Sequence, residues 1–371
     1  MSVSETMLLD LLLAPMLRDA VGLIQRDVAS GADVDLAMKL GAGHAEGPLE
    51  RLQTVGQAEA ERMLGRPLTS AARVDSSPRP PASEIELPEG PVGVIGTGFM
   101  ASGIAYAFAV AGFEVVVVGR SEDATAGSKA RIEADLARAL KRERITEEDA
   151  AAALARVAFA TDLVALASAP LVIEAVAEDL EVKRELFARA DAVLDPAASL
   201  ASNTSSLKIA AIASGCGNPE RVLGIHFFSP VPAMKLVEVI APAGVAEERA
   251  EQATAWAERI GKVPVRSADE NGFIVNRLLI PMLNDAVRAN DEGLASIAEI
   301  DELMTSRGGT PMGSFALLDL IGLDISLAAQ RSIHGASEDP RLEPAKGLVE
   351  RVEAGELGRK SGAGFHDYAK A

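Results

Sequence analysis

The segment from Val92 to Arg120 constrains the fold most, because short apolar runs flank a glycine-rich turn within it. Val92–Ile95 is an apolar run typical of a buried strand, and the turn that follows is Gly96–Ala101. The apolar stretch 103–110 then predicts a helix, and 115–118 predicts a second buried strand. A strand, a glycine turn, a helix and another strand form the opening unit of a dinucleotide-binding fold.

The glycine turn predicts where a dinucleotide would bind. Gly96 allows a tight turn, and Gly98 lets backbone N–H groups approach a pyrophosphate. The N-terminus of the following helix adds a partial positive charge. The predicted cofactor-binding residues of the turn are Gly96, Gly98, Phe99, Met100 and Ala101. The alternative is a glycine-rich turn that binds no ligand.

The end of the second strand distinguishes between the nicotinamide cofactors. An NAD site places an acid there for the ribose 2′-hydroxyl, but this chain has Gly119, Arg120 and Ser121. A guanidinium pairs well with a 2′-phosphate, which a carboxylate would repel. We therefore predict NADP(H) as the cofactor, with contacts from these three residues and NAD(H) as the alternative. Arg120 could also be a solvated loop residue.

Composition excludes several classes of protein. A chain of 371 residues with 48% hydrophobic residues is expected to form two or three domains and not to be disordered. The net charge of −18 argues against nucleic acid and membrane surfaces as partners. Cys216 is the only cysteine, so we expect no intramolecular disulfide and no thiolate metal cluster. Glu5 and Asp10 interrupt the apolar N-terminus, so we expect neither signal peptide nor membrane span, and a cytoplasmic protein.

The chain also contains an internal repeat. Residues Leu12–Gly56 align without a gap with Leu278–Gly322, at a constant offset of 266. Each copy predicts a long amphipathic helix, a serine N-cap (Ser30 or Ser296) and a second helix that ends in glycines. Two similar helical surfaces predict either a homodimer or a pseudo-dimer in which the copies pack together.

A basic segment follows the second strand. Residues Lys129–Arg144 predict a helix that is net basic, although the chain is acidic. Lys141 and Arg142 are candidates to bind the phosphates of a coenzyme A substrate. The alternative is a solvated face stabilised by i,i+4 ion pairs.

Three polar clusters follow predicted strands, and ligands of open parallel sheets bind at the carboxyl ends of strands. The first holds Glu174 and Glu178, after a strand at 171–173. The second is Ser202–Ser206, which includes Asn203, a candidate cofactor-binding residue, and precedes a predicted helix at 206–213. At least one hydroxyl of this cluster is expected to cap that helix, leaving the others for substrate. The third is Ile225–Pro232.

His226 is the strongest candidate for a catalytic residue. Of the four histidines, only His226 directly follows a strand-like run, 222–225, within the dinucleotide-binding region. Imidazole exchanges protons near neutral pH, as the oxidation of an alcohol by hydride transfer requires. Phe227 and Phe228 would exclude water. The alternative is a core histidine that hydrogen bonds to backbone.

Glu238 is the candidate partner of that histidine. It lies in the middle of the apolar strand predicted over 236–240, where a carboxylate needs a partner unless its face is solvated. The offset of twelve positions between the two leaves room for a strand, a proline turn and a returning strand. A Glu238–His226 pair would fix the tautomer of the ring and raise its basicity.

These motifs, taken together, resemble the 3-hydroxyacyl-CoA dehydrogenase family from about Pro91 to Tyr368. The residues that carry the resemblance are Gly-Thr-Gly-Phe-Met (96–100), Val-Ile-Glu-Ala-Val (172–176), Ser-Asn-Thr-Ser-Ser-Leu (202–207), His-Phe-Phe-Ser-Pro-Val-Pro (226–232), Lys-Leu-Val-Glu-Val-Ile (235–240), Gly-Phe-Ile-Val-Asn-Arg-Leu-Leu (272–279) and Gly-Arg-Lys-Ser-Gly-Ala-Gly-Phe (358–365). The resemblance implies an α/β fold with a Rossmann-type domain, followed by an all-helical domain that usually mediates dimerisation. We expect the domains 1–64 (helical repeat), 65–90 (proline-rich linker), 91–270 (dinucleotide-binding) and 271–371 (helical).

The resemblance also implies site roles. His226 would be the acid/base and Glu238 its orienting partner. Ser205 and Asn276 would hold the reacting oxygen of the substrate, and Glu178 would lie near the nicotinamide. The chain departs from the family in several places: Ala101 replaces a glycine, Gly119 replaces the ribose-binding acid, Ser229 stands where Asn is common, and His366 stands where Tyr is common. Asp10 is the counterpart of Asn276 in the first copy, which is therefore expected to be structural.

The expected reaction is reversible hydride transfer between a nicotinamide cofactor and C3 of a short-chain 3-hydroxyacyl-CoA. One alternative is a related dehydrogenase of a free hydroxy acid or sugar acid. Another is a nucleotide-binding sensor or interaction protein without turnover.

Overall fold

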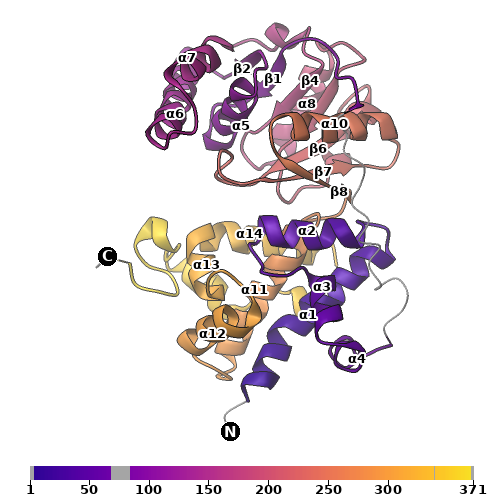
Figure 1. The fold of residues 1–371 in the computed structure, drawn as a ribbon, viewed down its shortest axis with the longest axis vertical. Helices are drawn as coiled ribbons and strands as arrows, with labels where there is room; N and C mark the ends of the chain where they lie inside the picture. Colours follow the sequence, from indigo (N-terminus) through magenta and orange to yellow (C-terminus); the bar gives the residue numbers. More distant parts are fainter. Residues whose placement is uncertain (1–3, 68–83, 338, 369–371) are drawn as a thin grey trace. The chain divides into compact units, whose positions relative to one another are not determined.

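The computed structural model describes residues 4–67, 84–337 and 339–368, which form two compact units (Figure 1). One unit is Arg79–Asp269, and the other combines Met1–Pro78 with Glu270–Ala371. Most of the expected linker over 65–90, namely 68–83, lies outside the described residues. No helix within the described ranges is long and apolar enough to cross a membrane.

The first unit is built on one eight-stranded sheet with the order β3-β2-β1-β4-β5-β6-β7-β8. The strands are β1 (Val92–Ile95), β2 (Val115–Val118), β3 (Val157–Ala160), β4 (Leu171–Glu174), β5 (Ser199–Ser202), β6 (Val222–Phe227), β7 (Leu236–Ala241) and β8 (Val263–Ala268). Neighbouring strands are parallel except for β6 and β7, which are antiparallel. The strand order reverses between β1 and β4, which is where such sheets bind dinucleotides. The predicted α/β fold class is confirmed.

Helices cover both faces of this sheet. They are α5 (Phe99–Val110), α6 (Glu122–Lys141), α7 (Glu147–Ala155), α8 (Leu180–Asp191), α9 (Ile209–Ala213) and α10 (Glu247–Arg259), with short 3-10 turns at Leu163–Leu166 and Pro219–Arg221. Leu223, Ile225 and Phe227 of β6 join the core formed with α5 and α10, where Phe108 and Trp256 meet edge to face. Gly224 alternates with them and faces Ile209 of α9. Burial on both faces explains why these strands are apolar runs without polar alternation.

The predicted helix over Lys129–Arg144 needs a correction. Helix α6 begins seven residues earlier, at Glu122, and ends at Lys141. Ser121 caps it by accepting a hydrogen bond from the backbone N–H of Ala124 at 3.2 Å. The first turns carry small and acidic residues whose apolar periodicity is weak, so the charge-based prediction missed them.

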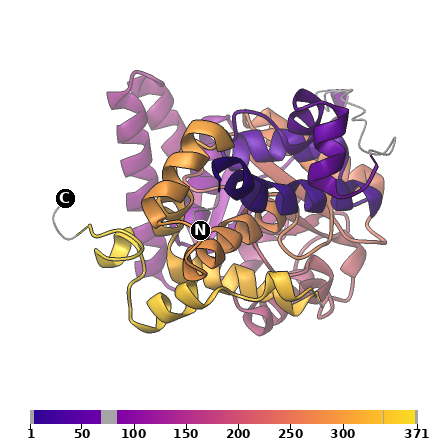
Figure 2. The same ribbon diagram turned by 90° about the horizontal axis from the view of Figure 1, so that it is seen from below.

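The described part of the second unit consists of helices and loops, with isolated β-bridges over 358–367. Its helices are α1 (Glu5–Gln25), α2 (Gly31–Gly41), α3 (Pro48–Thr54), α4 (Gln57–Leu64), α11 (Val275–Asp291), α12 (Ile297–Leu303), the π-helical turn η5 (Met304–Gly308), α13 (Ser314–Ile321), α14 (Leu323–Gly335) and α15 (Lys346–Glu353), with 3-10 turns at Pro340–Leu342 and Arg359–Ser361. At the sequence offset of 266, α1 corresponds to α11, α2 to α12 with η5, α3 to α13, and α4 to the first part of α14. The long helices α1 and α11 pack against each other (Figures 1 and 2).

Candidate active site

The turn after β1 has the shape that a pyrophosphate site requires. Gly96 has φ +124°, and a Cβ there would lie 2.6 Å from the carbonyl oxygen of Ala175. Gly98 is the N-cap of the 12-residue helix α5, and a Cβ on it would meet nothing within 4 Å. The backbone is therefore open to a ligand at the positive end of a helix. The residues of this turn fit a dinucleotide.

The end of β2 carries no carboxylate. A Cβ on Gly119 would lie 2.7 Å from the Cγ2 atoms of both Thr97 and Thr125, so the packing leaves no room for a side chain there. Arg120 follows and is exposed. The hydroxyl of Ser121 caps α6 by accepting a backbone hydrogen bond. Of the three residues predicted to bind the ribose end of the cofactor, Arg120 alone thus presents a charged side chain to solvent.

The structure does not bring Lys141 and Arg142 to this edge of the sheet. They lie at the C-terminal end of α6, whose 20 residues extend about 30 Å from the end of β2. Both side chains are exposed. Elsewhere on the helix, Arg138 pairs with Asp135 and Lys129 lies 4.0 Å from Glu133, as expected for a solvated face.

His226 and Glu238 meet across the β6–β7 hairpin. The antiparallel register places them directly opposite each other. The Nδ1 atom of His226 lies 2.7 Å from Oε2 of Glu238. The carboxylate has no exposed surface, and 6% of His226 is exposed. A contact between Nδ1 and a carboxylate oxygen fixes the orientation of the imidazole ring.

An aromatic ring contacts His226, and an amide side chain binds the residue next to it. The ring of Phe228 lies against its imidazole, with the ring centroids 4.5 Å apart. The backbone N–H of Phe227 donates to the side-chain oxygen of Asn203 at 2.8 Å. Asn203 thereby ties the end of β6 to the loop after β5. The polar cluster predicted over Ser202–Ser206 therefore lies beside β6, the strand that carries His226.

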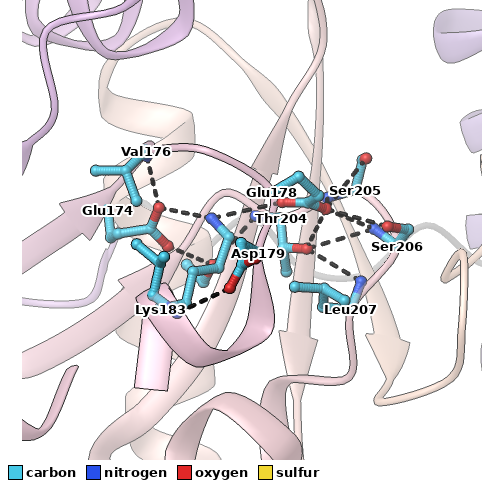
Figure 3. A network of polar contacts seen from close by, with 11 residues as sticks. Glu174, Val176, Glu178, Asp179, Lys183, Thr204, Ser205, Ser206 and Leu207 are labelled. Atoms are coloured by element: carbon cyan, nitrogen blue, oxygen red, sulfur yellow. Dashed lines mark hydrogen bonds and ion pairs between the residues drawn. The ribbon is translucent and has the colours of Figure 1, made fainter. Parts of the chain in front are cut away.

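A buried ion pair joins the ends of β4 and β5 to α8 (Figure 3). The Nζ atom of Lys183 lies 2.6 Å from Oε1 of Glu174, and both side chains are essentially without solvent exposure. Glu174 also accepts hydrogen bonds from the Ser202 hydroxyl at 2.7 Å and from the backbone N–H of Val176 at 2.6 Å. These contacts satisfy both carboxylate oxygens, as a buried charge requires.

Glu178 extends this network to the loop that carries Ser205. Its Oε1 accepts from the Thr204 hydroxyl at 2.5 Å and from the backbone N–H groups of Ser205 and Ser206 at 3.0 and 3.2 Å (Figure 3). Its Oε2 lies 3.5 Å from the Lys183 ammonium. Burial alone would raise the pKa of Glu178, but the Lys183 charge and these hydrogen bonds outweigh it and lower the pKa. Glu178 therefore stays an ionised acceptor.

The loop after β5 and helix α8 each differ from the sequence-based expectation in one feature. Helix α9 begins at Ile209 and not at 206, and its first N–H groups donate to Asp269, at 2.7 Å from Ile209 and 2.8 Å from Ala210. The Thr204 hydroxyl accepts from the backbone N–H of Leu207 at 3.1 Å, before the helix begins. Lys183 was not predicted at all. Its signal was present, because it occupies an apolar-face position between Leu180 and Phe187 at the spacing i, i+3, i+7.

Asn276, predicted to hold the substrate oxygen, belongs to the helical unit. It lies in the first turn of α11 and is half-buried. Its counterpart Asp10 forms an ion pair with Arg62 at 2.8 Å. Within the described residues, no group of three or more His, Cys, Asp or Glu side chains is placed to hold a metal ion.

Comparison with known proteins gives consistent matches. The family model described as "3-hydroxyacyl-CoA dehydrogenase, NAD binding domain" matches residues 91–270. The model described as "3-hydroxyacyl-CoA dehydrogenase, C-terminal domain" matches two segments, 7–83 and 272–368. The second match agrees with the internal repeat.

Relatives and solved structures match over most of their length. The chain is 42% identical over 280 residues to "3-hydroxybutyryl-CoA dehydrogenase" of Bradyrhizobium diazoefficiens, covering 76% of this chain and 96% of the relative. It is 39% identical over 302 residues to "Hydroxyacyl-coenzyme A dehydrogenase, mitochondrial" of Homo sapiens, covering 80% and 96%. The crystal structure of (S)-3-hydroxybutyryl-CoA dehydrogenase from Ralstonia eutropha matches with a TM-score of 0.73 and 40% identity, covering 75% and 99%. The chain belongs to the 3-hydroxyacyl-CoA dehydrogenase family.

Proposed function

We propose that this chain is an NADP(H)-preferring dehydrogenase that interconverts short-chain 3-hydroxyacyl-CoA and 3-oxoacyl-CoA. The observation that carries the proposal is the His226–Glu238 pair, 2.7 Å apart at the carboxyl edge of the sheet. The glycine turn fits a dinucleotide, and several similar relatives are named 3-hydroxybutyryl-CoA dehydrogenase, which supports a short acyl chain.

His226 is the proposed acid/base. In the oxidative direction its Nε2 takes the proton of the 3-hydroxyl group, and in the reductive direction it returns that proton. Glu238 is a positioning residue, since it holds Nδ1 and stabilises the imidazolium formed when the ring is protonated. The nicotinamide of a dinucleotide whose pyrophosphate binds at the glycine turn would accept or donate the hydride.

Ser205 and Asn276 are proposed to hold the reacting oxygen. The backbone N–H of Ser205 donates to Glu178, so the loop that presents its hydroxyl is fixed by the same carboxylate that we place beside the cofactor. Hydrogen-bond donors preset in this way stabilise negative charge that develops on an oxygen. Asn276 would add an amide donor from the helical unit.

The preference for NADP(H) rests on Gly119 and Arg120. The missing carboxylate at the end of β2 removes the group that selects the ribose 2′-hydroxyl, and the exposed guanidinium offers a partner for a 2′-phosphate. Glu122 and Asp123 in the first turn of α6 act in the opposite direction. NAD(H) therefore remains the alternative cofactor.

The partners follow from this assignment. An acyl-CoA is the proposed substrate, without a contact to Lys141 or Arg142, which lie at the far end of α6. The helical repeats are proposed to supply the surface for pairing, either between two chains as a homodimer or within one chain as a pseudo-dimer. The cytoplasmic location stays a prediction.

One assay tests the activity. Purified protein is mixed with acetoacetyl-CoA and either NADPH or NADH. Oxidation of the cofactor is followed as a fall in absorbance at about 340 nm. We expect turnover with a higher kcat/KM for NADPH. Turnover of free hydroxy or sugar acids without turnover of the acyl-CoA would instead indicate the related dehydrogenase. Cofactor binding with no turnover of either would indicate a sensor.

A further inference from the structure

The two helical repeats share details finer than their helix pattern. We define the N-terminal repeat as residues 5–64 and the C-terminal repeat as residues 271–330. In the first, Asp35 accepts hydrogen bonds from the backbone N–H groups of Leu49 and Glu50 at 2.7 and 3.2 Å. In the second, their counterparts Asp301, Phe315 and Ala316 form the same contacts at 2.8 and 3.3 Å. The repeats are therefore two copies of one fold.

Contacts between the repeats are reciprocal. The backbone N–H of Ala45 donates to the carbonyl of Gly309 at 2.8 Å. The counterparts of this pair are Pro311 and Gly43, and a Cβ on Gly43 would lie 2.9 Å from Cγ of Pro311. Reciprocity also holds for whole elements, because α1 packs on η5 while α11 packs on α2. A residue pair that recurs with its roles exchanged is the mark of a two-fold, self-complementary interface.

The two long helices that meet at this junction share their buried apolar positions. The equivalent positions of α1 and α11 that are buried in both helices and apolar in both are Leu12 and Leu278, Leu13 and Leu279, Ala14 and Ile280, Met16 and Met282, Leu17 and Leu283, Ala20 and Ala286, Val21 and Val287, and Leu23 and Ala289. These helices pack on each other, so each supplies cover for the other (Figures 1 and 2). A C-terminal repeat alone would expose the part of α11 that packs on α1, and a second copy of the same repeat would be a complementary cover for it.

The side chain of Arg341 contacts both long helices at this junction. Arg341 pairs with Asp285 of α11 at 2.8 Å and with Asp19 of α1, the equivalent residue of the other repeat. Arg277 lies 3.9 Å from Asp19. A single guanidinium thus bridges two equivalent carboxylates, which holds the repeats together at a point where two like charges would otherwise face each other.

From these contacts we propose that the N-terminal repeat occupies, within its own chain, the face through which the C-terminal repeat would otherwise pair with a second copy of this chain. The occupant of that face is the chain's own α1–α4. The full chain is therefore a monomer that contains a pseudo-dimer of helical repeats. This inference decides between the two assemblies that the proposed function left open.

The first test is the mass of the full chain in solution. Sedimentation equilibrium across a range of concentrations should give the mass of one chain, 38.6 kDa. A stable dimer of the full chain would overturn the proposal. The measurement needs no variant, so it does not depend on how well any variant folds.

The second test asks whether the repeats pair within one chain. In a Cys216→Ser background, Ala45→Cys and Gly309→Cys place two thiols next to each other. A Cβ added to Gly309 would lie 3.8 Å from the Cβ of Ala45, within the range for a disulfide. Oxidation should give an intrachain disulfide, seen as a faster monomer band on a non-reducing gel. A cross-linked dimer would show that the repeats are exchanged between chains and would overturn the proposal.

Arg341 supplies a matched set of variants for the same cross-linking assay. Arg341→Met leaves the two carboxylates facing each other and should slow intrachain cross-linking about tenfold. Adding Asp19→Asn should restore most of the rate, whereas Lys346→Gln, at an exposed position of the same unit, should not change it. An Arg341→Met rate equal to that of the parent would contradict the role of the bridge. Neither test uses turnover, so failure here is distinct from failure of the proposed activity.

Discussion

At the scale of single residues, the pairing of His226 follows from strand register. Two residues directly opposite in an antiparallel pair have neighbouring side chains on the same face of the sheet. The Glu238 carboxylate therefore reaches Nδ1 without distortion of the hairpin, and its lack of solvent exposure keeps that contact dry. A shift of one residue in register would separate the two side chains onto opposite faces.

The first prediction concerns His226 itself. His226→Ala should lower kcat by about three orders of magnitude, because general acid–base catalysis contributes roughly that much. His226→Gln should lose a similar amount, since an amide cannot exchange the proton although it can still donate to Glu238. Steady-state kinetics measure the loss, and a fluorescence titration should show that NADPH still binds. Turnover near that of the parent in either variant would refute the role.

The second prediction concerns cofactor choice. Arg120→Ala should lower kcat/KM for NADPH about tenfold or more while leaving that for NADH nearly unchanged, because a charge-assisted pair with the 2′-phosphate is lost. Arg142→Ala, an equally exposed arginine at the opposite end of α6, is the matched control and should change neither value. An equal loss with both cofactors would mean that Arg120 does not bind the 2′-phosphate.

At the scale of secondary-structure elements, the Glu174–Lys183 pair joins α8 to the ends of β4 and β5. Breaking a buried ion pair by removing one partner leaves an uncompensated charge, which costs about 3–5 kcal/mol. The Lys183 ammonium also lowers the pKa of Glu178, which holds the Ser205 loop. We therefore expect Lys183 to be a positioning residue that influences catalysis indirectly.

The third prediction tests that role. Lys183→Met should lower the free energy of unfolding by about 3 kcal/mol or more in urea denaturation, and the double variant Glu174→Gln, Lys183→Met should recover much of the loss. The single variant should also raise the pKa of Glu178 and add an acid limb to the pH profile of KM for the cofactor. Glu181→Gln, an exposed partner of Arg184 on the same helix, should stay within about 0.5 kcal/mol. A purely structural lysine would leave the pH profile unchanged.

The elements that sequence predicted best are those with strong local patterns. The glycine turn, the buried strands and the His226–Glu238 hairpin follow from apolar runs, glycines and a proline turn within a few residues of each other. Asp269 could not be predicted as the cap of α9, because about sixty residues separate it from the N–H groups that it binds. Lys183 was missed although it occupies a position on the apolar face of α8, because its buried partner Glu174 lies on a different element. The roles of Ser205 and Asn276 stay predictions, because they depend on a bound substrate.

At the scale of the whole molecule, acid stability depends on a histidine of the N-terminal repeat. Burial lowers the pKa of His44 from its ordinary value of 6.5 to about 4, and the charge of Arg51 contributes. In the unfolded chain, His44 therefore takes up a proton at a higher pH than in the folded chain. His44 therefore stabilises the fold fully above pH 6.5, and this stabilisation is lost as the pH falls from 6.5 to 4.

The fourth prediction is a pH-dependent difference. His44→Thr installs the residue that the C-terminal repeat has at the equivalent position, Thr310. Relative to the parent, the variant should gain up to about 3 kcal/mol of unfolding free energy between pH 6.5 and 4, because it no longer has to keep a buried imidazole neutral. Urea titrations at several pH values measure the difference. A constant difference across this range would show that His44 titrates as in the unfolded chain.

The covalent connection between the repeats has a consequence for how the molecule behaves on dilution. The α1–α11 junction lies within one polypeptide, so forming it is a unimolecular event whose equilibrium contains no concentration factor. A two-chain assembly built on the same surface would dissociate at low protein concentration. We therefore expect the two repeats of this chain to stay paired at any protein concentration.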